Sequence, residues 1–342
     1  MSIRISSARV ALAALCAALS LSLSFASSAA GAKTVTAELR VLTPTRVLDP
    51  GTTYVVGSGK VRTDPSADCN FGGAGGTGAS FDLPRPTALG LLAAGADANP
   101  RLRPLSLTDE FGFGLAICAI GKVDDRPGTF WYLKRDHSEL TVGADQEPIR
   151  DGDQFLIYLA PDMFPAPNPA ELELRAPARA EPGERFTVTA LEHACVTDET
   201  TFEVSCSSTA AEGVEIEGGG GAVTTGADGT ARVSAGEAAR LRLVGRRGAD
   251  IPSNLVEVCV KGGRDRCPAR RGERIVGRSE ADRIRGTSGS DVIRARGGGD
   301  RIDIRGGGSD RVSCGSGKDT VLVKRSDRDD RLARDCERIR RR

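Results

Sequence analysis

The chain has 342 residues, of which 39% are hydrophobic and only 4% aromatic, and its formal net charge is +1. This length favours two or three domains, and the hydrophobic content excludes a chain that is disordered throughout. Residues 33–267 carry 24 cationic and 33 anionic side chains, a net charge of −9, whereas residues 268–342 carry 21 and 13, a net charge of +8. Such a contrast indicates separate modules with separate partners.

The first 32 residues have the pattern of a secretory signal peptide. Arg4 and Arg9 form a basic region, an apolar stretch follows over Val10–Phe25, and Ala30-Gly31-Ala32 resembles a cleavage site. No later run reaches the roughly 18 apolar residues that a membrane-spanning helix needs. We therefore predict a secreted, extracellular protein without a transmembrane segment.

Eight cysteines follow the predicted signal peptide, and an even number in an exported chain indicates four disulfide bonds. The spacing predicts one bridge between Cys69 and Cys118 and another between Cys314 and Cys336. The pairing of the middle four, which are either local pairs or crossed, is left open. These four are Cys195, Cys206, Cys259 and Cys267.

Residues 33–162 are predicted to form a β-sheet wrapped around one helix. The strands are expected at Val35–Val41, Phe111–Ile120, Thr129–Leu133, Glu139–Val142 and Gln154–Leu159, and the helix at Pro86–Ala94.

Several motifs in this region resemble the C-terminal β-grasp domain of transcobalamin and its bacterial relatives. They are Leu39-Arg40-Val41 with Thr45-Arg46, the helix start Pro86-Thr87-Ala88-Leu89-Gly90, Phe130-Trp131-Tyr132-Leu133, Thr141-Val142-Gly143-Ala144 and Asp151-Gly152-Asp153-Gln154-Phe155-Leu156. The resemblance implies a sheet that binds a soluble ligand. It departs at Lys134-Arg135-Asp136-His137, where the family tends to carry an Asn-Gly hairpin turn. A ligand-free adhesive or spacer module is the alternative interpretation.

Residues 170–262 show short alternating runs with turn residues at intervals near ten, which favours a small β-sandwich. Thr225-Gly226-Ala227-Asp228-Gly229-Thr230-Ala231 is similar to a turn of bacterial immunoglobulin-like extracellular modules, and this resemblance implies a spacer. The expected strands are Arg185–Ala190, Thr201–Ser205, Val214–Glu217, Ala231–Ser234, Ala239–Val244 and Leu255–Val260.

From Gly277 onward a nine-residue repeat appears, of the form Gly-Gly-x-Gly-x-Asp-x-aliphatic-x. It resembles the calcium-binding repeat of RTX proteins, the haemolysin type. The resemblance covers residues 273–342 and implies a parallel β-roll. The aspartates are Asp282, Asp291, Asp300, Asp310 and Asp319, followed two residues later by Ile284, Ile293, Ile302, Val312 and Val321.

Two nonapeptides complete a coil of about eighteen residues, so successive aspartates alternate between two edges of the roll. Asp282, Asp300 and Asp319 are expected along one edge, and Asp291 and Asp310 along the other. Calcium prefers six to eight oxygen ligands, which stacked turns can supply together. We predict these five aspartates as calcium ligands, although the turn before Asp282 lacks the central glycine.

The net charge of +8 opposes cation binding unless the arginines of this segment point away from the aspartates. Arg283, Arg301 and Arg311 each follow an aspartate directly. Because neighbouring residues of a strand face opposite sides, we expect these arginines to face outward. The alternative is a metal-free roll held by Asp–Arg pairs and the bridge between Cys314 and Cys336.

Only two histidines occur, His137 and His193, which leaves most hydrolytic mechanisms without a general base. His193 lies two residues before Cys195, a spacing that suits a thiol catalyst or a zinc site, but a cysteine of an exported chain is expected to form a disulfide. His137 is predicted to be a solvated residue of a hairpin turn. These observations favour a protein that is not an enzyme.

The basic end of the chain, Arg338–Arg342, suits an anionic cell-wall or surface polymer. No Phe, Trp or Tyr follows Phe202, so base stacking is lacking there and specific nucleic-acid binding is not expected. The sequence thus predicts a mainly β, secreted, calcium-binding protein with a structural or adhesive role. The alternative function is an extracellular small-ligand carrier that uses the β-grasp domain and has a metal-free tail.

Overall fold

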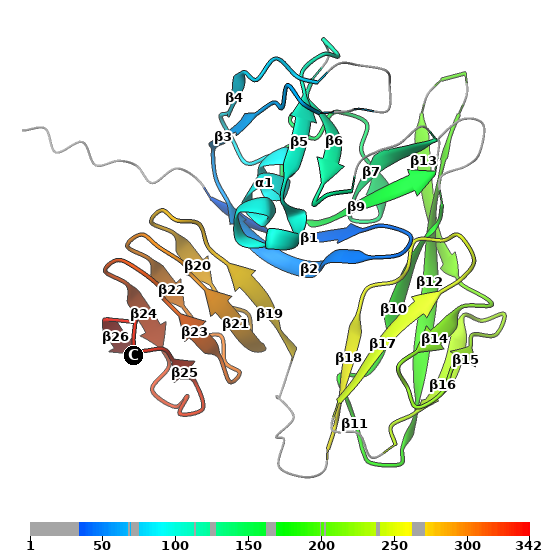
Figure 1. Cartoon of the computed structure of the whole chain (residues 1–342). Coiled ribbons are helices and arrows are strands. Elements are labelled where there is room, and N and C mark those ends of the chain that lie inside the picture. Colours follow the sequence, from blue (N-terminus) through cyan, green and yellow to red (C-terminus); the bar gives the residue numbers. More distant parts are fainter. Residues whose placement is uncertain are drawn as a thin grey trace, which may run out of the picture. The chain divides into compact units, whose positions relative to one another are not determined.

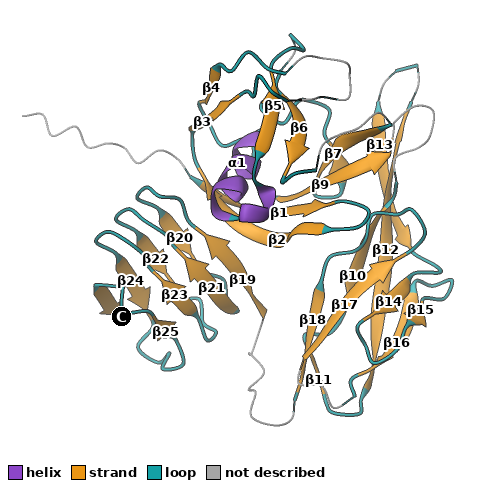
Figure 2. Ribbon diagram, in the orientation of Figure 1, coloured by secondary structure: helices purple, strands orange, loops and turns teal. Residues whose placement is uncertain are grey.

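The computed structural model describes residues 34–67, 69, 75–112, 114–123, 128–161, 169–198, 200–201, 203–236, 240–261 and 271–342 (Figure 1). The predicted signal peptide lies outside these residues. The described chain is mainly β, as the sequence predicts, with 26 strands and a single α-helix (Figure 2). Within these ranges, no helix is both long enough and apolar enough to cross a lipid bilayer.

The first part of the chain is organised around strand β1, which pairs antiparallel with β2 and parallel with β9. β9 in turn pairs antiparallel with β7, and β7 with β8. Two further pairs, β3 with β4 and β5 with β6, form small separate sheets. The strands are β1 (Val35–Leu42), β2 (Val47–Val56), β3 (Gly59–Arg62), β4 (Ser80–Leu83), β5 (Leu105–Thr108), β6 (Ala116–Ile120), β7 (Thr129–Arg135), β8 (Ser138–Glu139) and β9 (Gln154–Pro161).

Helix α1 (Ala88–Ala98) packs its apolar side chains against the core of this sheet, and a short 3-10 turn follows at Pro100–Leu102. It begins two residues later than Pro86 because Thr87 caps it: the Thr87 hydroxyl accepts the N–H of Gly90 at 3.1 Å. A Cβ atom at Gly95 would lie 2.7 Å from Leu39 of β1. Glycine at this position therefore allows the helix to lie close to the sheet.

The second part of the chain is a sandwich of two sheets. One sheet holds β10, β12 and β13, with β16 also paired to β12, and the other has the order β11-β18-β17-β14-β15. Their facing side chains form one apolar cluster that includes Leu174, Val188 and Leu243. The strands are β10 (Glu171–Arg175), β11 (Arg179–Ala180), β12 (Arg185–Thr197), β13 (Val204–Ala210), β14 (Glu215–Glu217), β15 (Val223–Thr224), β16 (Thr230–Ser234), β17 (Arg240–Arg246) and β18 (Val256–Val260).

Strand β13 differs from the predicted strand at Thr201–Ser205, because it begins at Val204 and continues to Ala210. Its register is set by β12, where Cys195 lies opposite Cys206. The side chains of β13 are mostly exposed, so hydrophobic alternation could not define its length.

The third part of the chain is a coil of parallel strands, as the repeat predicts. Even-numbered strands form the sheet β20-β22-β24-β26, and odd-numbered strands form the series β19-β21-β23-β25. All five aliphatic residues of the repeat are buried, and they fill one core between the two series. The strands are β19 (Arg271–Val276), β20 (Arg283–Arg285), β21 (Ser290–Arg294), β22 (Arg301–Asp303), β23 (Arg311–Ser313), β24 (Thr320–Val323), β25 (Arg331–Leu332) and β26 (Arg338–Arg341).

Strand β19 also pairs with the first part of the chain, which the sequence did not indicate. It runs parallel to β2, with Ile275 opposite Thr53, and the Thr53 hydroxyl donates to the Glu273 carboxylate at 3.1 Å. The odd-numbered series and the first sheet are therefore one nine-stranded sheet. This pairing satisfies backbone groups at the β2 edge that would otherwise stay open to another chain.

The disulfide bonds confirm both predicted pairs, Cys69–Cys118 and Cys314–Cys336. Among the middle cysteines, Cys195 and Cys206 form a local bridge between neighbouring strands. Because its sulfur is bonded to Cys206, Cys195 serves neither as a thiol catalyst nor as a zinc ligand. Cys259 is also disulfide-bonded, and Cys267 lies outside the described residues.

Candidate metal-binding site

The five aspartates of the repeat are all buried, at 3% exposure or less, and each lies at or just before the start of a strand. The structure places Asp282, Asp300 and Asp319 in one row, before β20, β22 and β24. Asp291 and Asp310 lie in the other row, with β21 and β23. This is the alternation that two nonapeptides per coil require.

Hydrogen bonds connect the members of each row. The N–H of Asp282 donates to Oδ1 of Asp300 at 2.8 Å, and the N–H of Asp300 donates to Oδ1 of Asp319 at 2.7 Å. In the other row the N–H of Asp291 donates to Oδ1 of Asp310 at 2.8 Å. One oxygen of each acceptor carboxylate is thus used to hold the coil above it.

The second oxygen of these carboxylates is buried and has no hydrogen-bond donor among the described residues. This holds for Oδ2 of Asp300, Asp319 and Asp310. A buried carboxylate oxygen without a partner is costly, because it has lost its hydration without gaining a compensating contact. A bound cation or a proton can supply the missing contact.

The electrostatics agree with this geometry. Burial raises the pKa of Asp300 to about 7, and the charges of Asp282 and Asp319 add to the increase. Burial also raises the pKa of Asp310 to about 7, with further increases from Asp291 and Asp330. At neutral pH both rows therefore favour an added positive charge.

Two of the predicted ligands already have their own partners. Arg278 binds Asp282 through a guanidinium contact of 2.8 Å, and its N–H donates to the other oxygen at 2.7 Å. Asp291 accepts from the N–H and hydroxyl of Thr287 and from the N–H of Glu273, each at 2.7 Å. Of the five predicted ligands, the structure therefore favours Asp300, Asp310 and Asp319 over Asp282 and Asp291.

The rows extend beyond the predicted residues. Oδ1 of Asp330 accepts the N–H of Asp310 at 3.1 Å, and Glu337 accepts the N–H of Asp319 at 3.0 Å. Oδ2 of Asp330 and of Asp327 is buried without a donor in the described part of the chain. Burial raises the pKa of Asp330.

A sequence signal for these residues exists but is not the glycine motif. An acid, an arginine and an aliphatic residue occur in succession at Asp282, Asp300 and Asp310, and also at Glu273, Asp330 and Glu337. The last two acids lack the preceding glycines, and their spacing departs from nine. Each acid–arginine–aliphatic triplet lies at or near the start of a strand, whereas the glycines mark the turns between strands.

The arginines of the triplets point away from the rows, as predicted. Arg283, Arg301 and Arg311 are exposed, and among the described residues only Asp282 of the five repeat aspartates has an arginine ion pair. The Asp–Arg pairing that the metal-free alternative expects along the whole roll therefore occurs, in the described structure, at only one of these five aspartates. The +8 charge of the segment lies mostly outside the candidate sites.

Glycines allow the coils to stack at the spacing that the rows need. Gly317 has a φ of +139°, and a Cβ atom there would lie 1.5 Å from the carbonyl oxygen of Gly298 in the coil above. A Cβ atom at Gly286 would lie 2.6 Å from Oδ2 of Asp291. Any side chain at these positions would force the coils or the carboxylate to move.

The donor set consists of carboxylate oxygens, which suit hard cations. The donor-free oxygens of the rows belong to Asp300 and Asp319 in one row and to Asp310 and Asp330 in the other, and Asp327, whose charge raises the pKa of Asp310 and Asp330, has a further one. No family model matches this chain, and neither any curated protein nor any solved structure compared with it gives a match.

Proposed function

We propose that this chain is a secreted, non-enzymatic calcium-binding protein whose calcium sites lie along the two aspartate rows. The observation that carries the proposal is the set of buried carboxylate oxygens without donors, at Asp300, Asp319, Asp310 and Asp330. They occur where stacked turns bring acidic side chains from successive coils together. The resemblance of the repeat to RTX sequences supports the same cation.

Calcium fits this arrangement better than other common cations. It accepts six to eight oxygens in flexible geometry, so carboxylates of two coils and turn carbonyls can contribute together. Magnesium demands near-ideal octahedral geometry and retains water, and zinc prefers nitrogen and sulfur ligands. Extracellular calcium modules need dissociation constants of only about 10⁻⁴ to 10⁻³ M, which short and partly irregular coils can reach.

Binding and folding are expected to be coupled in this segment. Ligand at ten times its dissociation constant stabilises the folded state by about 1.4 kcal/mol per site. Among the described residues, the core of the coil consists of aliphatic side chains and the Cys314–Cys336 bridge, without an aromatic side chain. A gain of this size at each row is therefore a substantial part of the stability of the segment.

Calcium titration of the whole chain by isothermal calorimetry tests the proposal. Asp300→Asn and Asp310→Asn are each expected to remove one binding event, because Asn still accepts the ladder hydrogen bond but carries no charge. Asp303→Asn is the matched control, since Asp303 lies on β22 and pairs outward with Arg305 at 2.6 Å. Absence of calcium binding at millimolar concentration, or binding unchanged in both row variants, overturns the proposal.

Export is part of the proposal and has separate support. Several disulfides occur in the described structure, which indicates an oxidising compartment. Together with the signal-like first 32 residues, they favour secretion. A structural or adhesive role, with exposed C-terminal arginines such as Arg338 toward an anionic surface polymer, agrees with this location.

A small-ligand carrier is the second candidate, and one observation favours it. A pocket of about 670 Å³ lies beside α1, lined by Lys60 and Arg62 of β3 and by Arg103. Its volume is typical of small-molecule sites, and its charged lining residues are these three cations and one acid, Asp97, a balance that suits an anionic ligand. Saturable binding of a small anion that Arg103→Ala abolishes, with calcium binding absent, would favour this function instead.

A further inference from the structure

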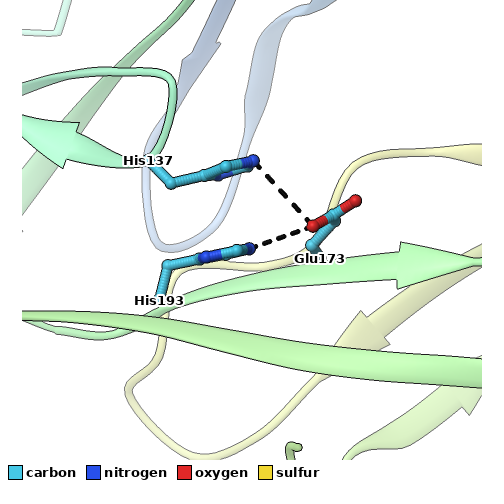
Figure 3. A group of neighbouring side chains, drawn as sticks. All are labelled: His137, Glu173 and His193. Carbon is cyan, nitrogen blue, oxygen red and sulfur yellow. Dashed lines mark hydrogen bonds and ion pairs between the residues drawn. The ribbon is translucent and has the colours of Figure 1, made fainter. Parts of the chain in front are cut away.

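Both histidines of the chain meet one glutamate at a place remote in sequence from the aspartate rows (Figure 3). His137 belongs to the turn between β7 and β8, His193 to β12, and Glu173 to β10. Nε2 of His193 lies 3.0 Å from Oε2 of Glu173, and Nε2 of His137 lies 3.9 Å from the same oxygen. His137 thus lies in a hairpin turn, as predicted, but its side chain is only 29% exposed and contacts His193 and Glu173, so it is not fully solvated.

The backbone explains why these side chains converge. β10 and β12 pair antiparallel with Glu171 opposite His193, so Glu171, Glu173 and His193 share one face of the pair. In the facing hairpin, Asp136 and His137 have φ angles of 47° and 70°. Two successive left-handed residues form the tight hairpin turn that an Asn-Gly sequence usually makes, and here they direct an imidazole at the sandwich.

The two imidazole rings are stacked, with centroids 3.7 Å apart and planes 7° from parallel. Both Nε2 atoms lie on the side that faces Glu173 (Figure 3). One nitrogen of each histidine and one oxygen of Glu173 lie within 4.8 Å of one another. The set is thus three potential metal ligands around one point.

Glu171 lies beside the other ring nitrogen of His137. Nδ1 of His137 is 3.1 Å from Oε2 of Glu171, at ion-pair distance, and neither atom has a hydrogen-bond partner among the described residues. Glu171 is buried, and its carboxylate is ion-paired with Arg40 and Lys134 at 3.1 and 3.4 Å. Nε2 of His137 faces Oε2 of Glu173 at 3.9 Å, whereas Nε2 of His193 is hydrogen-bonded to that oxygen at 3.0 Å.

We propose that His137 Nε2, His193 Nε2 and Glu173 bind a single divalent transition ion of the zinc class, with a water molecule as fourth ligand. A cation at this point would replace the hydrogen bond between His193 and Glu173 and would bring Nε2 of His137 to the same ion. Glu171 lies 3.1 Å from Nδ1 of His137, on the side of the ring where zinc-binding histidines usually have a carboxylate neighbour. Two imidazoles and one carboxylate are a donor set that zinc accepts in tetrahedral geometry.

Neighbouring groups hold the ligands in place. The Lys134 ammonium donates to the backbone carbonyl of His193 at 3.1 Å, and Arg175 grips both oxygens of Glu173 at 2.7 and 3.0 Å. Arg175 is largely exposed, so water screens its charge. The ion would connect the β7–β8 turn to the β10–β12 face, and its expected role is to fasten this contact.

The test is zinc titration of the tag-free whole chain in saturating calcium, with a chromophoric chelator as competitor and Co²⁺ as spectroscopic probe. We expect one zinc per chain and the visible absorption of tetrahedral Co²⁺. His193→Ala and His137→Asn should weaken zinc binding more than about 100-fold, because even outer-shell partners are worth 10- to 100-fold. Asn tolerates the left-handed turn, so His137→Asn should keep the hairpin.

Asp136→Asn is the matched control, since it changes the neighbouring turn residue without touching the three ligands, and it should leave zinc affinity unchanged. Because the chain has only two histidines, NMR provides a readout that needs no variant: both imidazole signals should shift together with one equivalent of zinc. Zinc binding that is absent, insensitive to both histidine variants, or lost in Asp300→Asn overturns the inference. Calcium binding is unaffected by that result, so the two proposals fail separately.

Discussion

The backbone N–H of Asp291 donates to the carboxylate of Asp310 across one full coil, at 2.8 Å. The carboxylate that holds the coil above it thereby keeps one buried oxygen free of donors. Structural and metal-binding roles are thus divided between the two oxygens of one side chain.

In the metal-free protein, the contribution of Asp300 and Asp310 to stability should fall as pH rises from about 4 to 7. The pKa values of Asp300 and Asp310 are raised to about 7 in the folded chain, mainly by burial, so the folded state binds more protons than the unfolded state in this window. Their contribution is fully present below about pH 4 and is lost by about pH 7. Thermal melting in chelator, for wild type and for the Asp300→Asn, Asp310→Asn double variant, measures it.

The difference between wild type and the double variant isolates these two groups from the rest of the chain. With calcium in excess, the wild-type dependence in this window should disappear, because the cation replaces the proton. Parallel pH profiles of the two proteins in chelator would contradict the burial of these carboxylates.

Asp330→Asn should weaken calcium binding in the second row although Asp330 lies outside the glycine motif. Its Oδ2 is buried without a donor, while its Oδ1 accepts from Asp310, a bond that Asn can keep. Calorimetry should show loss of one binding event. Asp329→Asn changes the adjacent, exposed aspartate and should behave like wild type; equal effects of the two variants would point to net charge alone.

Gly317→Ala should destabilise the coil by more than about 2 kcal/mol. The new Cβ would lie 1.5 Å from the Gly298 carbonyl oxygen, and the φ of +139° is strained for any residue with a side chain. Gly299→Ala is the control, because a Cβ there lies 3.6 Å from the nearest atom. Denaturant unfolding compares them, and equal midpoints would count against the stacking.

Glu171→Gln should lower the free energy of unfolding by about 3–5 kcal/mol, because it leaves buried Arg40 and Lys134 without their anion. Burial opposes ionisation of Glu171, but His137, Arg40 and Lys134 prevail and lower its pKa to about 2. Glu217→Gln breaks an exposed pair with Arg246 and should cost no more than about 1 kcal/mol. Urea denaturation at neutral pH distinguishes the buried pair from the exposed one.

Local patterns predicted most strands of the repeat and several of the first part, since each depends on alternation within a few residues. The sequence does not predict strand β2, because Pro50 and Gly51 interrupt its alternation of apolar and polar residues. In the structure, Leu39 pairs with Thr52 and Arg40 with Pro50, so Gly51 forms a bulge that absorbs the interruption. Sequence alternation cannot show a bulge whose partner lies on another strand.

For the candidate ligands, too, the sequence predicts position along a strand but not contacts with other parts of the chain. The period of the repeat determined that Asp300, Asp310 and Asp319 lie in two rows with aliphatic residues inside, because side-chain direction follows from position along a strand. It could not determine which carboxylates stay free, since that depends on donors from elsewhere, such as Arg278 at Asp282 and Thr287 at Asp291.

The amino-acid sequence by itself determined the mainly β character, two disulfide pairs and the pacing of the aspartates, all of which are properties of spacing along the chain. Only the tertiary structure decided that β19 pairs with β2 and that His137 meets His193 and Glu173. These contacts join residues tens to hundreds of positions apart. Their geometry is fixed by how sheets and turns pack, which no local pattern records.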